Sequence, residues 1–153
     1  MKNIHSLWLS LVLLLSITLF AFTSAPAPAE FAVIVNAGNP VGNLTASEVK
    51  LYYLRKLKKR WPGINKNIRP ADRKTPVPEQ EAFYAHVLDM SAVDVEKYFT
   101  NKQLQSAERP PDKFSTDTDV IGFVTTEPGA IGYVSLKSLT PDVKEKVKVV
   151  LQF

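Results

Sequence analysis

The sequence predicts an α/β fold in which a mixed sheet carries helices on its faces, and three observations support this prediction. Segments typical of strands alternate with segments typical of helices along the chain, as in α/β domains. Phe31–Asn36 is a continuous apolar run, which is typical of a strand buried on both faces in a parallel or mixed sheet. Residues 119–135 combine a short helix, a glycine turn and a second apolar strand.

The helix of this last unit shows the expected spacing of apolar residues. Val120, Phe123 and Val124 recur three and four positions apart, which places them on one helical face. Thr116, or Asp117 just after it, is predicted to cap the start of the helix by accepting a backbone N–H.

The turn and strand that follow are predicted from proline and glycine. Pro128 ends the helix, because the residue before a proline is disfavoured in helical geometry. Gly129 is expected to supply the free backbone angles of a tight turn. Residues 130–134 are small, branched or aromatic, and Gly132 among them lets a helix pack close to the strand.

The N-terminus is predicted to be an export signal. Lys2 precedes an uncharged apolar run at residues 7–22, which is shorter than the roughly 20 residues needed to span a bilayer. Ala27 and Ala29 are small residues at the positions that favour cleavage before Glu30. We therefore expect a signal peptide at residues 1–29 and one domain at residues 30–153; the alternative is an uncleaved membrane tether.

Composition narrows the class of protein. Removing 29 of the 153 residues leaves 124, enough for one hydrophobic core. This part carries 18 Lys and Arg against 15 Asp and Glu, a net charge of +3. The sequence has no cysteine, so it has no disulfide, no thiolate metal site and no lipid anchor on cysteine. These features fit a bacterial periplasm or the cell exterior.

Three further helices are predicted. Thr45 with Glu48 forms a capping box, and its helix carries an apolar stripe and ends at residues 61–63, Trp-Pro-Gly. The second helix covers residues 79–88, with Pro78 near its first turn. Ser91 with Asp94 opens the third, which runs through Phe99.

The remaining segments are assigned as short strands and loops. Residues 68–71 are expected to form a short strand, and residues 72–78 a loop. Residues 105–115 are expected to form a second loop, and residues 147–153 the closing strand.

The strongest candidate for a binding site lies in a basic stretch. Residues 50–74 hold ten basic residues and a single acid, Asp72, so this stretch attracts anions. Asp72, Arg73, Lys74 and Thr75 come just before a helix start, where free N–H groups favour an oxyanion. Arg73 suits two parallel hydrogen bonds to it, and Asp72 would orient Arg73 or accept a proton from the ligand. The alternative is a surface ion pair between Asp72 and Arg73 on an ordinary solvated loop.

The sequence offers little for catalysis. His86 is the only histidine after residue 29, and it lies in the middle of a helix. No catalytic triad spacing, cluster of metal ligands, phosphate loop or dinucleotide fingerprint is present, so we expect no enzyme, metal or cofactor. Aromatic and basic residues do not alternate on a strand, which argues against a nucleic-acid partner.

Four segments together resemble the phosphate ABC transporter substrate-binding proteins, and most closely small single-domain members of that type II periplasmic binding protein family. The segments are FAVIVNAGNPVGNLTASEVKLYYLRKLKKRWPG, IRPADRK, EAFYAHVLDMS and RPPDKFSTDTDVIGFVTTEPGAIGYV. The resemblance extends over residues 31–135, and residues 129–133 are its most specific part.

The resemblance implies one lobe of a protein whose full-length members clamp an oxyanion between two lobes without catalysing a reaction. By position, Arg73 matches the family's arginine. The family's small-residue helix start falls on Thr75, Pro76 and Val77, where its serine and glycine are missing. The ligands of the second lobe have no counterpart in the sequence.

Two functional hypotheses follow. The first is an exported module that binds phosphate or a related oxyanion weakly at Arg73, Lys74 and Thr75, linked to phosphate ABC transport. The second is a protein-interaction or accessory module that docks a partner or a second copy through the open face of the lobe. An enzyme that uses His86 is the weakest alternative.

Overall fold

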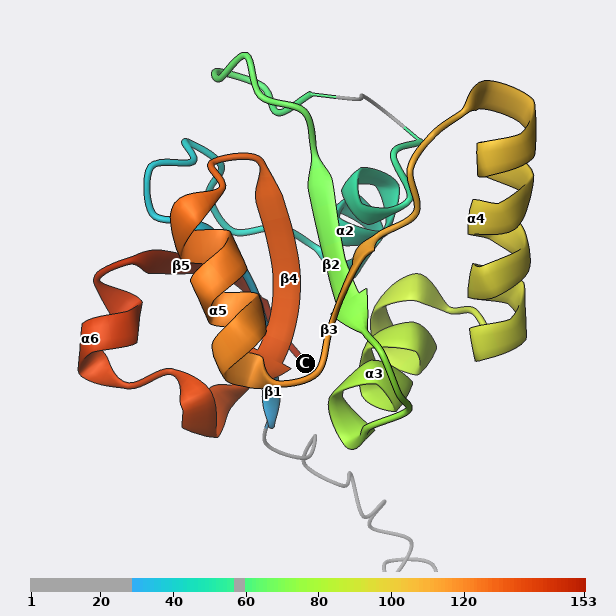
Figure 1. Cartoon of the computed structure of the whole chain (residues 1–153). Coiled ribbons are helices and arrows are strands. Elements are labelled where there is room, and N and C mark those ends of the chain that lie inside the picture. The colour runs from blue at the N-terminus through green and yellow to red at the C-terminus, as the bar shows by residue number, and fades with distance from the viewer. Residues whose placement is uncertain (1–28, 57–59) are drawn as a thin grey trace, which may run out of the picture.

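A five-stranded mixed sheet organises residues 29–56 and 60–153, the part of the chain that this computed structural model describes (Figure 1). The strand order is β3-β2-β4-β1-β5. The strands are β1 (Phe31–Asn36), β2 (Arg69–Arg73), β3 (Asp112–Phe114), β4 (Ala130–Ser135) and β5 (Val147–Gln152).

The sheet divides into a parallel and an antiparallel half. β2 is parallel to both of its neighbours, β3 and β4. β1 is antiparallel to β4 and to β5, with Ile34 opposite Gly132 on one side and opposite Val149 on the other. The central strands β4 and β1 are buried on both faces, which explains their continuous apolar sequences.

One face of the sheet is covered by helix α5 (Asp117–Thr126). Ala32 and Ile34 of β1 and Val134 of β4 face Val120 and Val124 of this helix in one apolar cluster. The helix lies unusually close to β4 in this cluster.

Gly132 makes this close approach possible. A Cβ atom at Gly132 would lie 2.7 Å from Cγ1 of Val120, closer than carbon atoms in folded proteins approach one another. The predicted reason for this glycine is therefore confirmed.

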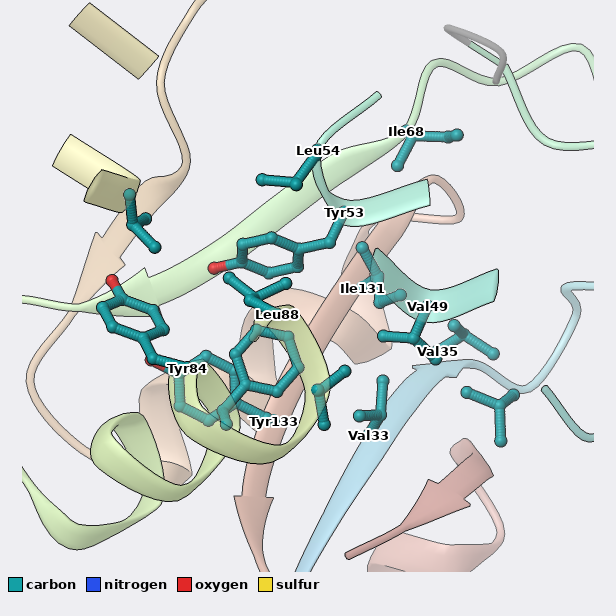
Figure 2. Packing of buried hydrophobic residues seen from close by; sticks show 14 of the residues in the cluster. Val33, Val35, Val49, Tyr53, Leu54, Ile68, Tyr84, Leu88, Ile131 and Tyr133 are labelled. Carbon is teal, nitrogen blue, oxygen red and sulfur yellow. The ribbon is translucent and has the colours of Figure 1, made fainter. Parts of the chain in front are cut away.

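The opposite face is covered by α2 (Ala46–Tyr53), α3 (Pro78–Ala82) and the π-helical segment η1 (Phe83–Leu88). Because side chains alternate along a strand, Val33, Val35, Ile131 and Tyr133 point to this face. Their cluster contains Tyr53, Phe83 and Tyr84 (Figure 2), and the rings of Phe83 and Tyr133 stack with centroids 4.3 Å apart.

Several local predictions are confirmed. β1 has the expected bounds, Thr45 and Glu48 form the capping box of α2, and Ser91 caps α4 (Ala92–Ser106). Thr116 caps α5 with Asp119 as its partner, and α5 ends at Thr126, just before Pro128.

Other local predictions are wrong. α2 ends at Tyr53 rather than at residues 61–63, and residues 57–59 lie outside the described part of the chain. α4 runs through Phe99 as expected and ends at Ser106, so only its last two residues lie in the segment expected to be a loop. Residues 105–115 contain β3, and Asp72 and Arg73 belong to β2 rather than to a loop.

Gly129 is present for a reason other than the expected one. Gly63 is the only glycine of the described residues with a positive φ, so Gly129 does not use the left-handed region. A Cβ atom at Gly129 would lie 2.0 Å from the backbone oxygen of Asn67. The glycine is therefore required by the close approach of two backbone segments.

The C-terminal part adds the 3₁₀ turn η2 (Leu136–Ser138) and the short helix α6 (Pro141–Lys144) before β5. Within residues 29–56 and 60–153, no helix has the length and hydrophobicity that a membrane-spanning helix requires. The signal peptide expected at residues 1–29 lies almost wholly outside the described residues.

Candidate functional site

The candidate site is a cavity of about 400 Å³ at the carboxyl end of β2. Open α/β sheets characteristically bind ligands at the carboxyl ends of their strands. The four residues predicted from the sequence, Asp72, Arg73, Lys74 and Thr75, all line this cavity. Lys113 of β3 joins them, and α4 forms the opposite wall.

The Asp72 carboxylate lies at the floor of the cavity and is 1% exposed. Its Oδ1 accepts hydrogen bonds from the hydroxyl of Tyr133 at 2.5 Å, from the backbone N–H of Arg73 at 2.8 Å and from Nε2 of Gln80 at 3.1 Å. Its Oδ2 accepts from Nζ of Lys113 at 2.6 Å and from the hydroxyl of Tyr84 at 2.7 Å. Five donors therefore occupy both carboxylate oxygens.

These donors determine the ionisation of Asp72. Burial raises the pKa of the Asp72 carboxyl, but hydrogen bonds from Lys113, Tyr133 and Tyr84 and the positive charge of Lys113 outweigh burial and hold the pKa below its usual value. Burial, followed by the charge of Asp72, raises the pKa of Tyr84 and of Tyr133. The carboxylate is thus charged and the two hydroxyls are neutral donors at neutral pH.

The Arg73 guanidinium points away from Asp72. Successive residues of a strand point to opposite faces, so Arg73 follows Ala71 toward the face covered by α5. There its Nη2 pairs with Oδ1 of Asp117, the first residue of α5. The side chain of Arg73 is 3% exposed, its guanidinium carbon lies 5.8 Å from the ring centroid of Tyr133, and its Nε has no partner in the described residues.

Asp117 is fixed by other donors besides Arg73. Its Oδ2 accepts from the backbone N–H of Ser135 at 3.0 Å and from the hydroxyl of Ser138 at 2.5 Å. A carboxylate at the first position of a helix is also stabilised by the helix dipole. The expected surface ion pair between Asp72 and Arg73 is therefore replaced by two other pairs, Lys113 with Asp72 and Arg73 with Asp117.

Lys74 and Thr75 differ from the two residues before them because both are exposed. In residues 29–56 and 60–153 the Lys74 ammonium and the Thr75 hydroxyl have no hydrogen bond or ion pair, while the Lys74 backbone N–H donates to the carbonyl of Phe114 at 3.0 Å. Lys113 pairs with Asp72 but keeps 48% of its side chain exposed. These three groups are accessible to a ligand in the cavity.

Sequence reasoning missed Lys113, Gln80 and Tyr84. Lys113 lies in a segment that was expected to be a loop, and only its pairing with β2 brings it beside Asp72. Gln80 and Tyr84 lie four residues apart on α3 and η1, a spacing that places both on one helical face, but nothing local marks their carboxylate partner.

Neither a metal site nor the histidine belongs to the cavity. The described residues contain no group of three or more histidine, cysteine, aspartate or glutamate side chains that suits a metal ion. His86 is an exposed residue of η1 and does not line the cavity.

No family model and no curated protein matches the chain. Among solved structures, it is similar to a protein described as a "Putative Phosphate ABC Transporter Substrate-Binding Protein" with bound phosphate from Clostridium perfringens, at 21% identity and a TM-score of 0.62. It is also similar to an ABC-type phosphate transport receptor from Vibrio cholerae, at 18% identity and a TM-score of 0.56. A third similar structure is PstS from Borrelia burgdorferi, at 14% identity and a TM-score of 0.59.

Each of these similarities covers 80% of this chain but only 44%, 45% and 46% of the respective solved chain. The chain therefore spans less than half the length of these structures. The comparison shows the fold expected from the sequence, a mixed α/β sheet with helices on its faces.

Proposed function

We propose that this chain is an exported solute-binding module that binds phosphate or a related oxyanion weakly, with Lys74, Thr75 and Lys113 as the contacting residues. The observation that supports this proposal is the cavity at the carboxyl end of β2, which brings two ammonium groups and a hydroxyl to one opening. The fold adds support, since the similar structures include a phosphate transport receptor.

Weak binding follows from the state of the predicted arginine. Arg73 already pairs with Asp117 and is buried, so its guanidinium reaches a ligand only if that pair is given up. Pro76 and Pro78 lack the N–H groups that a helix start normally offers to an anion. The remaining contacts come from side chains that are exposed or half exposed, where charge pairs are worth about 1 kcal/mol or less.

The test is a titration with inorganic phosphate, in which binding is detected by changes in heteronuclear NMR chemical shifts and in melting temperature. Saturation at about 100 times Kd stabilises the folded state by roughly 2.7 kcal/mol, which corresponds to several degrees for a domain of this size. Lys74→Gln is expected to weaken binding about fivefold, the equivalent of roughly 1 kcal/mol. Lys144→Gln, an exposed lysine on α6 outside the cavity, is the matched control.

Two results would reject the proposal. One is the absence of any phosphate-dependent shift up to millimolar concentrations. The other is an equal loss of affinity in Lys74→Gln and Lys144→Gln, because this would show attraction to net charge rather than binding at the cavity.

A protein-interaction role is the second candidate, and exposed apolar side chains on α4 favour it. Leu104 is 79% exposed and Val93 57% exposed, the two large apolar residues of the described chain that are most open to water. We expect a docking role to produce a dimer or a complex in light scattering that Leu104→Lys disrupts. A monomer at all concentrations that captures no protein would argue against this role.

The proposed module acts outside the cytoplasm and without catalysis. The apolar run at residues 7–22 supports export to the periplasm, and mass spectrometry of the protein from its native envelope tests it by locating the mature N-terminus. A mature chain that still begins at Met1 would favour the membrane tether.

A further inference from the structure

The cavity that holds Lys74 and Lys113 is chemically two-sided. Its cationic edge lies along the ends of β2 and β3, whereas the wall opposite is lined by Pro110 and Pro111 and by Val95 and Phe99 of α4, which are 2% and 7% exposed. Figure 1 shows that α4 lies at the side of the molecule, next to β3, so the part of the wall formed by α4 comes from an element outside the sheet.

The size of the cavity exceeds what an inorganic ion requires. At about 400 Å³ it falls in the range of sites for small organic ligands, roughly 300–1,000 Å³, and its lining combines polar and apolar side chains. An inorganic oxyanion at Lys74 would contact only the cationic edge and would leave the wall formed by α4 in water.

We propose that the preferred ligand is an organic phosphate, either a phosphate monoester or a phosphonate, with a compact, uncharged apolar substituent. This inference rests on the function proposed above. The oxyanion head lies at Lys74, Thr75 and Lys113, and the substituent packs against the wall formed by Val95, Phe99 and Pro110.

Glu96 sets a limit on the substituent. It is exposed on α4 and lines the same cavity, close enough that its charge contributes to the raised pKa of Tyr84. A second negative charge on the ligand would face this carboxylate and be repelled. The cavity therefore favours ligands with a single anionic end.

The test measures the affinity of the full exported domain for four probes: inorganic phosphate, phenyl phosphate, phenol and 4-carboxyphenyl phosphate. We expect phenyl phosphate to bind at least about tenfold more tightly than inorganic phosphate, and phenol and 4-carboxyphenyl phosphate to bind more weakly than phenyl phosphate. Lys74→Gln is expected to weaken phenyl phosphate and inorganic phosphate by similar factors.

Variants on α4 locate the substituent. Thr100→Trp places a large ring in the cavity from an exposed helical position and should remove most of the preference for phenyl phosphate while leaving inorganic phosphate unchanged. Asn101→Trp, the next residue along the helix and outside the cavity lining, is the control. Gln103→Trp repeats the test from the next turn in case Thr100→Trp does not fold.

The outcomes separate this inference from the proposed function. Equal affinity for inorganic phosphate and phenyl phosphate, both sensitive to Lys74→Gln, would overturn the inference and leave oxyanion binding intact. Binding of phenol as tight as that of phenyl phosphate, without an effect of Lys74→Gln, would overturn both. The inference is supported if the preference exists and disappears in Thr100→Trp but not in Asn101→Trp.

Discussion

Replacing Tyr133 with phenylalanine tests the buried network around Asp72 with the loss of one oxygen atom. The Tyr133 hydroxyl is one of five donors to the Asp72 carboxylate, at 2.5 Å, in a cluster where both side chains are about 1% exposed. Hydrogen bonds to charged groups stabilise proteins by about 1.5–3 kcal/mol. The ring of Tyr133 keeps its stacking on Phe83 in the variant, so the hydrogen bond is the main term lost.

We therefore expect Tyr133→Phe to lower the free energy of unfolding by about 1.5–3 kcal/mol. For a domain of this length, roughly 4 °C of melting temperature corresponds to 1 kcal/mol, so the expected loss is about 6–12 °C. Urea denaturation at neutral pH measures the free energy, and calorimetry the melting temperature. Tyr52→Phe is the control, because Tyr52 is half-buried against Trp61 and its hydroxyl has no hydrogen bond within the described residues.

Tyr133→Phe is also expected to change the pH at which the protein unfolds in acid. The folded-state pKa of Asp72 is depressed, so its contribution to stability is complete above the unfolded value of about 3.9 and is lost as pH falls toward the lower folded value. Loss of the Tyr133 donor raises the folded pKa, and acid unfolding should then begin at higher pH. A loss under about 0.5 kcal/mol together with an unchanged acid transition would refute this account of the network.

Three further predictions concern packing and the other buried polar groups. Gly132→Ala should lower the free energy of unfolding by about 1–3 kcal/mol, because the new methyl group would lie 2.7 Å from Val120. Gly122→Ala, where nothing lies within 4 Å of the new methyl group, should stabilise α5 by about 0.5–1 kcal/mol. Urea denaturation measures both variants, and equal effects would contradict the packing argument. Trp61→Phe should cost about 0.5–1.5 kcal/mol, because it removes the indole N–H that donates to the buried Gly129 carbonyl at 3.0 Å, whereas the backbone N–H of Arg69 still donates to this carbonyl at 2.8 Å. A thermal melt unchanged from wild type would count against it. In alkali, the free energy of unfolding should fall as pH rises above about 10, because folding raises the pKa of the buried Tyr53, Tyr84 and Tyr133. The absorbance of tyrosinate from these residues should then rise together with unfolding, and their ionisation in the still-folded protein would contradict the prediction.

Local signals made much of the fold predictable from the sequence. The apolar runs of β1 and β4 and the caps at Thr45, Ser91 and Thr116 depend on residues adjacent in the chain, and the structure has all of them. These signals act through the backbone of the same segment, so no knowledge of the tertiary structure is needed to recognise them.

The features that could not be predicted depend on distant parts of the chain. β3 is the three-residue segment Asp112–Phe114, with two charged residues, and it is a strand only because β2 lies beside it. Asp72 is separated by 61 residues from Tyr133 and by 41 from Lys113, so these two of its five donors can be identified only once the sheet is assembled. The sequence could locate the cavity through residues 72–75, but not the pairing inside it.

The pairing around β2 explains why the cavity presents lysine side chains rather than Arg73 to solvent. Asp72 and Asp117 balance Lys113 and Arg73, so these four residues together carry no net charge. Outside these two pairs, the cavity is lined by one cation, the exposed Lys74, and by one carboxylate, the exposed Glu96 of α4. Any attraction for an oxyanion must therefore arise mainly from Lys74 and from the exposed half of Lys113. Both lysine side chains are in contact with solvent, so the affinity for an oxyanion should fall as the salt concentration is raised. Contacts with an apolar substituent are not screened by salt, so they should then supply most of the remaining binding free energy.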